Sequence, residues 1–182
     1  NNAIVLPGKL EAYADFMVPV EVPGAVTEIE VDRGSLVGKG DKLLQVDDRV
    51  WREMKKQAAL DLREAKKELV RRKELHESGA VSVSDLDSFQ TRQELAAISL
   101  KKSEIQVDKC VITSPSDGLV NDRFLDVGEY AREGDPVFQV LQLDPMKLKL
   151  NIPEQNVASL RAGDPVRFTV DAFPGVTFTS RV

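Results

Sequence analysis

Few side chains in this sequence could carry out chemistry together at one place. His76 is the only histidine and Cys110 the only cysteine among the 182 residues. The segment between them has a helical pattern, so the two side chains lie at opposite ends of a rod and cannot form a nucleophile and base pair. The three methionines, Met17, Met54 and Met146, are scattered over three segments without a cluster of metal ligands. We therefore predict no catalytic residue, no metal site and no cofactor, and the chain is not expected to be an enzyme.

Composition and charge exclude further classes of function. The chain is 42% hydrophobic and 30% charged, which is ordinary for a soluble protein. Its formal net charge is −5, and basic and aromatic residues do not alternate in any patch, so no nucleic acid partner is expected. No run approaches the roughly 18 apolar residues of a membrane span, and the start of the sequence is not a signal peptide. We expect any targeting segment or lipid anchor to have been removed or to lie upstream.

The elements that must position the remaining residues are two copies of one β pattern. Residues 24–46 align without a gap with residues 118–140. In each copy a short apolar strand precedes a glycine turn, and a Gly-Asp pair, Gly40-Asp41 or Gly134-Asp135, precedes a second apolar strand. Each copy is too small to bury its apolar face alone, so the two must pair. The residues between them, about 48 to 110, are therefore an insertion.

The insertion has the periodicity of two helices. Ser82 and Asp85 form a capping box at the start of the second helix, and the few residues before it require the helices to run antiparallel. The hairpin tip therefore lies far from the β module, with His76 solvated near it and Cys110 in the core at its base. Apolar seams at steps of three and four predict the contact between the helices: Met54, Ala58, Leu62, Ala65 and Leu69 in the first helix; Leu86, Phe89, Gln93, Ala96, Leu100, Ser103, Val107 and Cys110 in the second.

Other residues of the insertion lie off the seams. Most charges are interpreted as a solvated helix face with pairs such as Asp48 and Arg52. Leu95, Ile98 and Ile105 form a second, narrower apolar line. This line either widens the contact inside the hairpin or packs against the hairpin of a neighbouring subunit.

The flanking segments predict further strands. Residues 6–12 and 16–20 read as extended segments separated by a polar break, and they are expected to pair with strands from the far end of the chain. Asp144-Pro145 is predicted to be a turn. A strand at 146–152, a short helix at 153–160 that ends before Gly163, and alternating strands at 166–170 and 176–182 follow. The alternation is still running at Val182, so we expect this β domain to be truncated or to continue beyond it.

Together these features resemble the periplasmic adaptor family, also called membrane fusion proteins, of tripartite efflux pumps. Val22-Pro23-Gly24-Ala25-Val26 through Gly40-Asp41, and Thr113-Ser114-Pro115 through Gly134-Asp135, are similar to the two halves of the family's lipoyl-like domain. The resemblance implies a multidomain fold of β structure plus a helical hairpin. A lipoyl-like β-sandwich, residues 20–47 and 111–143, is interrupted by an antiparallel coiled-coil hairpin, residues 48–110. Residues 1–19 and 144–182 would form a partial β-barrel domain.

The resemblance also identifies a docking motif at the hairpin tip. Adaptors that engage TolC-like outer-membrane channels carry an Arg, a Leu and a Ser at the spacing of Arg71, Leu75 and Ser82. An exposed leucine flanked by a guanidinium and a hydroxyl offers an apolar anchor with polar groups that fix its register. Each residue also has a purely structural explanation, since Ser82 caps a helix, Leu75 could cover the end of the hairpin and Arg71 could be solvated.

The resemblance implies a periplasmic protein that bridges an inner-membrane efflux transporter, of the RND type, and a TolC-like channel. It also implies an inner-membrane anchor, by an N-terminal lipid or helix, and self-association into a hexamer. The alternatives are an adaptor of an ABC-type efflux or type I secretion system, or a lipoyl or biotinyl carrier. A carrier needs its modified lysine in a tight hairpin between the halves, whereas Lys42 and Lys109 are not in such a turn. The hairpin is also shorter than in some members of the family.

Overall fold

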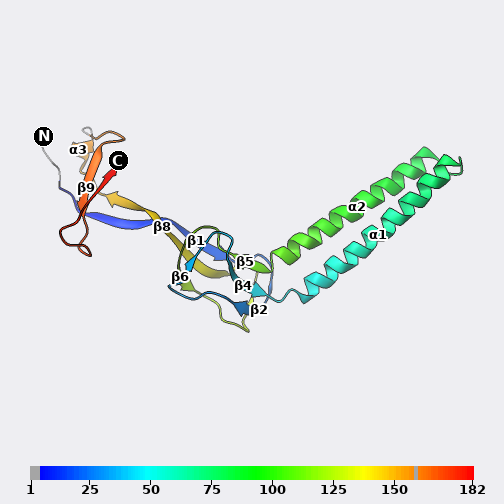
Figure 1. Cartoon of the computed structure of the whole chain (residues 1–182), viewed down its shortest axis with the longest axis horizontal. Coiled ribbons are helices and arrows are strands. Elements are labelled where there is room, and N and C mark those ends of the chain that lie inside the picture. Colours follow the sequence, from blue (N-terminus) through cyan, green and yellow to red (C-terminus); the bar gives the residue numbers. More distant parts are fainter. Residues whose placement is uncertain (1–4, 158–159) are drawn as a thin grey trace. The chain divides into compact units, whose positions relative to one another are not determined.

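The structure is a computed structural model that describes residues 5–157 and 160–182 (Figure 1). It divides into two compact units, each described here by itself. The central unit is Ala12–Pro145, and the terminal unit combines Asn1–Glu11 with Met146–Val182. Within the described residues, no helix combines the length and apolar character that crossing a membrane requires.

The strands of the two copies are arranged in a pair of sheets. The first copy supplies β2 (Gly24–Ile29), β3 (Leu36–Val37) and β4 (Lys42–Val46), and the second supplies β6 (Gly118–Arg123), β7 (Tyr130–Ala131) and β8 (Pro136–Leu150). With β1 (Gly8–Pro19) and β5 (Val111–Thr113), they form one sheet in the order β1-β8-β6-β3 and another in the order β5-β4-β2-β7. Each copy therefore places its two longer strands in one sheet and its short strand in the other.

The exchange of short strands follows the sequence repeat, because equivalent residues of the two copies form equivalent pairs. Gly24 pairs with Ala131 in one sheet, and the equivalent residues Gly118 and Val37 pair in the other. The register shift after Val26 in β2 has its counterpart after Val120 in β6. The predicted pairing of the two copies is therefore confirmed, but it is achieved by exchange between sheets rather than by one continuous sheet.

One hydrophobic core holds both copies together. Leu43 and Leu44 from the first copy, and Val137 and Phe138 from the second, are fully buried in the same cluster. Cys110 and Trp51, at the base of the insertion, also belong to this cluster or pack against it. The insertion is thus attached to the core at both of its ends. Its ends also lie side by side, because the Val46 N–H donates to the Cys110 carbonyl at 2.9 Å.

The long strands differ from the sequence prediction in two places. β1 runs without interruption through the segment expected to be a polar break, where Asp15 accepts a hydrogen bond from Gln139 of β8 at 2.7 Å. Its pairing with β8 confirms that the N-terminal segment joins strands from the far end of the chain. Asp144-Pro145, predicted to be a turn, instead lies within β8 and has a cis peptide bond.

The terminal unit contains a short antiparallel ribbon. β9 (Pro165–Thr169) pairs with β10 (Thr177–Arg181), and the rings of Phe168 and Phe178 stack with centroids 5.5 Å apart. Both strands were expected from their alternation. The predicted helix at 153–160 is observed as α3 (Glu154–Val157), while its positions Ala158 and Ser159 lie outside the described residues.

The insertion folds as a helical hairpin. α1 (Arg49–Glu77) and α2 (Val83–Asp108) lie side by side along their whole length (Figure 1). The second seam is confirmed, because all eight of its positions are half-buried or buried. On α1, Ala58 and Leu69 are buried, but Met54 is 54% exposed. The prediction for Met54 was wrong because the seam of α1 falls on the next residue: Lys55 is half-buried, and its Nζ lies 3.8 Å from Glu104 Oε1 of α2.

Candidate functional site at the hairpin tip

The turn at the tip begins with a well-formed helix end. The Ala80 N–H donates to the Leu75 carbonyl and the Gly79 N–H donates to the His76 carbonyl, both at 2.9 Å. These two bonds are the Schellman pattern that satisfies the last carbonyls of a helix. Gly79 has φ +78°, a conformation that glycine adopts without strain. The backbone that carries Leu75 is therefore fixed by the end of α1.

Ser82 fixes the start of α2. Its hydroxyl accepts a hydrogen bond from the Asp85 N–H at 3.1 Å and donates to Asp85 Oδ2 at 2.6 Å. The predicted capping role of Ser82 is confirmed. The reciprocal contact differs from the usual capping box, since the Asp85 carboxylate receives the hydroxyl proton. Because the proton of Ser82 is used here, the hydroxyl can offer a docking partner a lone pair.

His76 ties the helix end to the turn. Its Nδ1 lies 2.7 Å from the Val81 carbonyl oxygen, and the residue is half-buried. The expectation that His76 is solvated was wrong, because the turn folds back over the last residues of α1. The imidazole is therefore a structural part of the tip.

Arg71 and Leu75 lie one helical turn apart on the last part of α1. The side chain of Arg71 is 71% exposed, and its Nη1 donates to Glu68 Oε2 at 3.2 Å. Leu75 is 37% exposed. The three residues selected from the sequence are thus all on the surface of one hairpin tip, two on α1 and one at the N-cap of α2. No chemistry other than binding follows from an aliphatic group, a guanidinium and a hydroxyl arranged in this way.

Sequence reasoning missed a second group of residues at the tip. Arg72 lies with its guanidinium carbon 4.5 Å from the centroid of Phe89, and Arg92 lies 5.4 Å from the same ring. Arg72 also donates to Glu68 at 2.8 Å, so Glu68 contacts both Arg71 and Arg72. The four-residue spacing of Glu68 and Arg72 was a usable signal. The contact with Phe89 was not, because it depends on how α1 and α2 are paired.

At the opposite end of the hairpin, polar groups are more buried than their sequence suggests. Asp48 and Arg52 form the expected pair at 2.7 Å, but Asp48 is buried and also accepts from Gln45. Only the Asp48 side of the pair is shielded, because Asp48 lies where the chain leaves the core, whereas the side chain of Arg52 is 64% exposed as expected. Burial, with the nearby Asp48 carboxylate, raises the pKa of the Cys110 thiol to about 11. Lys109 forms an ion pair with Glu21 at 3.2 Å.

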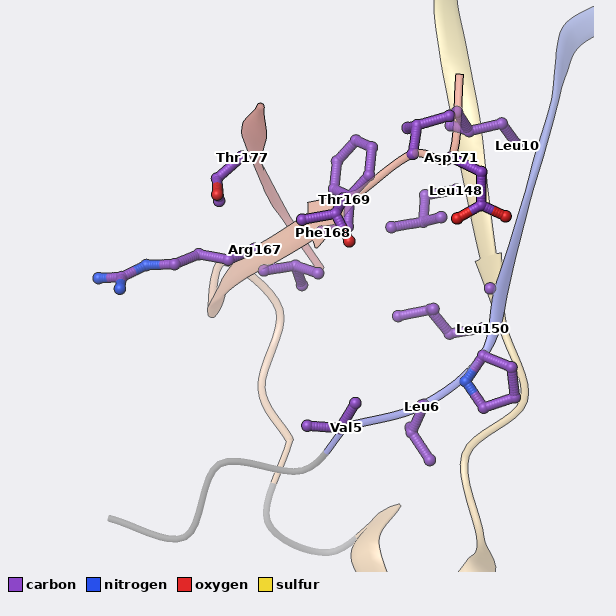
Figure 2. Close-up of a pocket in the computed structure, with 14 residues that line it drawn as sticks. Val5, Leu6, Leu10, Leu148, Leu150, Arg167, Phe168, Thr169, Asp171 and Thr177 are labelled. Carbon is purple, nitrogen blue, oxygen red and sulfur yellow. The ribbon is translucent and has the colours of Figure 1, made fainter. Parts of the chain in front are cut away.

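A cavity of about 550 Å³ lies in the terminal unit (Figure 2). Its walls are largely aliphatic and aromatic and include Leu148, Leu150 and Phe168. Figure 2 shows the guanidinium of Arg167 pointing away from the leucines. Across residues 5–157 and 160–182, no group of three or more His, Cys, Asp or Glu side chains could hold a metal ion. Polar side chains, among them Thr169 and Thr177, also line the cavity, and we assign no chemistry to it.

Several known proteins are similar to this chain in sequence, and two of them show the extent of the match. Multidrug resistance protein MdtA of Xenorhabdus bovienii is 28% identical over 169 residues, which cover 84% of this chain and 41% of MdtA. An uncharacterised protein of Haemophilus influenzae is 26% identical over 166 residues, which cover 91% of this chain and 44% of that protein. The chain therefore spans less than half the length of these two relatives. No protein-family model matches it.

Solved structures show the same fold. A chimera of MacA and MexA, which contains the α-hairpin domain of Pseudomonas aeruginosa MexA, superposes with a TM-score of 0.88 and 24% identity. The match covers 98% of this chain and 66% of the chimera. The likeness confirms the predicted fold class, in which β sheets flank an antiparallel two-helix hairpin.

Two sheets that exchange their short strands, with a helical hairpin inserted between the two copies, make up this shared fold. The chain is similar in sequence and fold to the periplasmic adaptors, or membrane fusion proteins, of efflux pumps.

Proposed function

We propose that this protein is the adaptor subunit of a tripartite multidrug efflux pump and that its hairpin tip binds a TolC-like outer-membrane channel. The observation that carries the proposal is the common exposure of Arg71, Leu75 and Ser82 at the end of a two-helix arm. Leu75 supplies an apolar anchor, while Arg71 and Ser82 supply a donor and an acceptor that fix its register. The similarity to MdtA supports a role in efflux.

The proposal includes an inner-membrane partner. We infer a periplasmic protein that is attached to the inner membrane and contacts a transporter of the RND type. The adaptor itself carries out no reaction, so the transporter supplies the energy. An ABC-type transporter could use the same docking tip, and the class of transporter that co-purifies with the tagged adaptor decides between the two.

Self-association, with six copies as the proposed number, is supported by the second apolar line of α2. Leu95, Ile98 and Ile105 are 61%, 52% and 42% exposed. The line therefore does not widen the contact inside the hairpin, which was one of the two explanations offered by the sequence. Packing against the hairpin of a neighbouring copy would cover these side chains.

The docking proposal is tested by charge insertion at the tip. Leu75→Asp places a carboxylate at the apolar anchor, and Ser82→Arg replaces the acceptor with a bulky cation. We expect either change to lower cross-linking to the channel and drug resistance at least about tenfold, because an anchor residue at an interface contributes about 2 kcal/mol or more.

The matched control is Leu60→Asp, which inserts the same charge at an exposed leucine of the same helix, well away from the tip. It should leave cross-linking to the channel unchanged, and circular dichroism should show folded hairpins in every variant. Normal cross-linking and resistance in both tip variants would exclude the docking assignment.

A further inference from the structure

The exposed arginine of the docking motif is connected to the opposite helix by a chain of side-chain contacts. Phe89 of α2 contacts the guanidinium of Arg72 on α1 at 4.5 Å. Arg72 Nε donates to Glu68 Oε1 at 2.8 Å, and the other carboxylate oxygen, Oε2, accepts from Arg71 Nη1 at 3.2 Å. Each link occupies a different atom, so all three contacts are formed at once.

The inner members of this chain are better shielded than its outer end. The side chains of Glu68 and Arg72 are 25% and 35% exposed, whereas that of Arg71 is 71% exposed. Phe89 is half-buried in the seam between the helices. A guanidinium over an aromatic face is attracted by the ring quadrupole, and more strongly when it is partly desolvated. The Glu68 carboxylate is therefore held in place from α2, and it in turn restrains a side chain that would otherwise be free.

We propose that Glu68, fixed by Arg72 and Phe89, is a positioning residue that presents Arg71 to the docking partner in one orientation. Among residues 5–157 and 160–182, Arg71 is bonded through Nη1 alone, so Nε and Nη2 are available to an acceptor. The acceptor on the partner is a carboxylate or a main-chain carbonyl, the groups that a guanidinium edge recognises. A prearranged arginine loses less side-chain freedom on binding than a mobile one.

This inference rests on the proposed docking function but makes a distinct claim. If Glu68 only competed with the docking partner for the Arg71 guanidinium, removing the charge of Glu68 would free Arg71 and tighten docking. If Glu68 positions Arg71, removing the charge weakens docking even though the free chain loses an ion pair.

The test uses the full chain and a TolC-like channel, purified in detergent from the same organism, as the probe. Glu68→Gln leaves one carbonyl oxygen where two carboxylate oxygens held two guanidiniums. We expect the Kd to rise about 3- to 10-fold, the loss for one side chain that must be ordered on binding. Glu64→Gln is the matched control: Glu64 is exposed, one turn earlier on α1, and forms no ion pair within the described residues. It should leave the Kd unchanged.

Two further readouts separate positioning from folding. In the Arg71→Ala background, Glu68→Gln should have no additional effect on the Kd, because the residue it positions is gone. NMR of the Arg71 Nε–Hε group in the unbound chain should show greater mobility in Glu68→Gln and in Phe89→Leu. Phe89→Tyr keeps the aromatic face and should retain the wild-type signal.

The outcomes are distinguishable. If the wild-type chain does not bind the channel, the proposed function fails and this inference fails with it. If the wild type binds but Glu68→Gln binds equally well or more tightly, positioning is refuted while the docking function stands. Unchanged Arg71 mobility in Glu68→Gln and Phe89→Leu would also refute the positioning role of Glu68.

Discussion

At the scale of single residues, Ser82 has two roles that one substitution would confuse. The hydroxyl caps α2 through Asp85, and the proposed docking uses the same oxygen. A loss of channel binding in a Ser82 variant is therefore informative only if α2 still begins at the same place.

Ser82→Ala should lower the free energy of unfolding by about 0.5–2 kcal/mol, because the Asp85 N–H then loses its partner. Ser82→Asn keeps a side-chain acceptor and should unfold close to the wild type. Thermal melting followed by circular dichroism at 222 nm checks both. Equal melting of the Ala and Asn variants would mean that the cap contributes nothing to stability.

Cys110 is the residue for which the structure predicts a pH effect. Burial raises the pKa of its thiol to about 11 from an ordinary value of 9.0. Because the folded-state pKa is raised, the contribution to stability is complete below pH 9 and is lost as the pH rises toward 11. Only the thiolate reacts with iodoacetamide, so labelling at pH 8 should be at least about 100-fold slower in the folded chain than in guanidinium.

Cys110→Ala is the control for the pH effect. Its stability, measured by urea unfolding at pH 8 and pH 10.5, should fall less between the two pH values than that of the wild type. Rapid labelling of the folded wild type at pH 8 would show that the thiol is not enclosed.

At the scale of elements, the same change from leucine to aspartate should have different effects on the two apolar lines of α2. Leu100 lies half-buried in the seam, whereas Leu95 is exposed on the surface of the same helix. Leu100→Asp places a charge between the helices and should destabilise the hairpin by more than about 2 kcal/mol. Leu95→Asp should leave the melting temperature of the isolated chain within about 2 °C of the wild type and weaken self-association.

Circular dichroism measures the first effect and analytical ultracentrifugation the second. If Leu100→Asp melts like the wild type, the register of α2 in the hairpin is incorrect. If Leu95→Asp associates normally, the second apolar line is not the contact between copies.

The helices show how far the sequence could be interpreted. The period of apolar residues in α2 predicts its buried face because one partner helix covers it along its length. α1 departs from its predicted pattern at Met54, because the position that faces α2 is occupied by Lys55, which is half-buried and forms an ion pair with Glu104. At the tip, the caps are local and follow from the sequence. The contact of Arg72 with Phe89 requires knowledge of how two distant segments pair, so it could not be predicted.

At the scale of the whole molecule, the sequence repeat predicted the duplication but not its form. Each short strand pairs with a strand of the other copy, and the whole insertion separates the two copies in the sequence. No local sequence pattern could therefore predict these pairs. The unbroken course of β8 through Asp144-Pro145 is another case, since this dipeptide favours turns by itself but lies inside a strand.

The two copies also differ in how tightly their glycines are packed. A Cβ added to Gly118 would collide with the Leu141 carbonyl oxygen, whereas the closest neighbour for a Cβ at the equivalent Gly24 is the Val46 Cβ at 3.3 Å. Gly118→Ala should therefore destabilise the protein by about 1–3 kcal/mol, and Gly24→Ala by less than about 1 kcal/mol. Urea unfolding of the two variants checks the difference. Equal losses would mean that the backbone around Gly118 moves aside.

The hydrogen bond from the Val46 N–H to the Cys110 carbonyl holds the chain side by side at the two points where it enters and leaves the helical hairpin. The distance between the two ends of the hairpin is therefore short, however many residues the hairpin contains. Whole helical turns can be added or removed between these anchors without a change in the scaffold. Evolution can then match the reach of such a protein to the gap it spans while the framework that holds it is conserved.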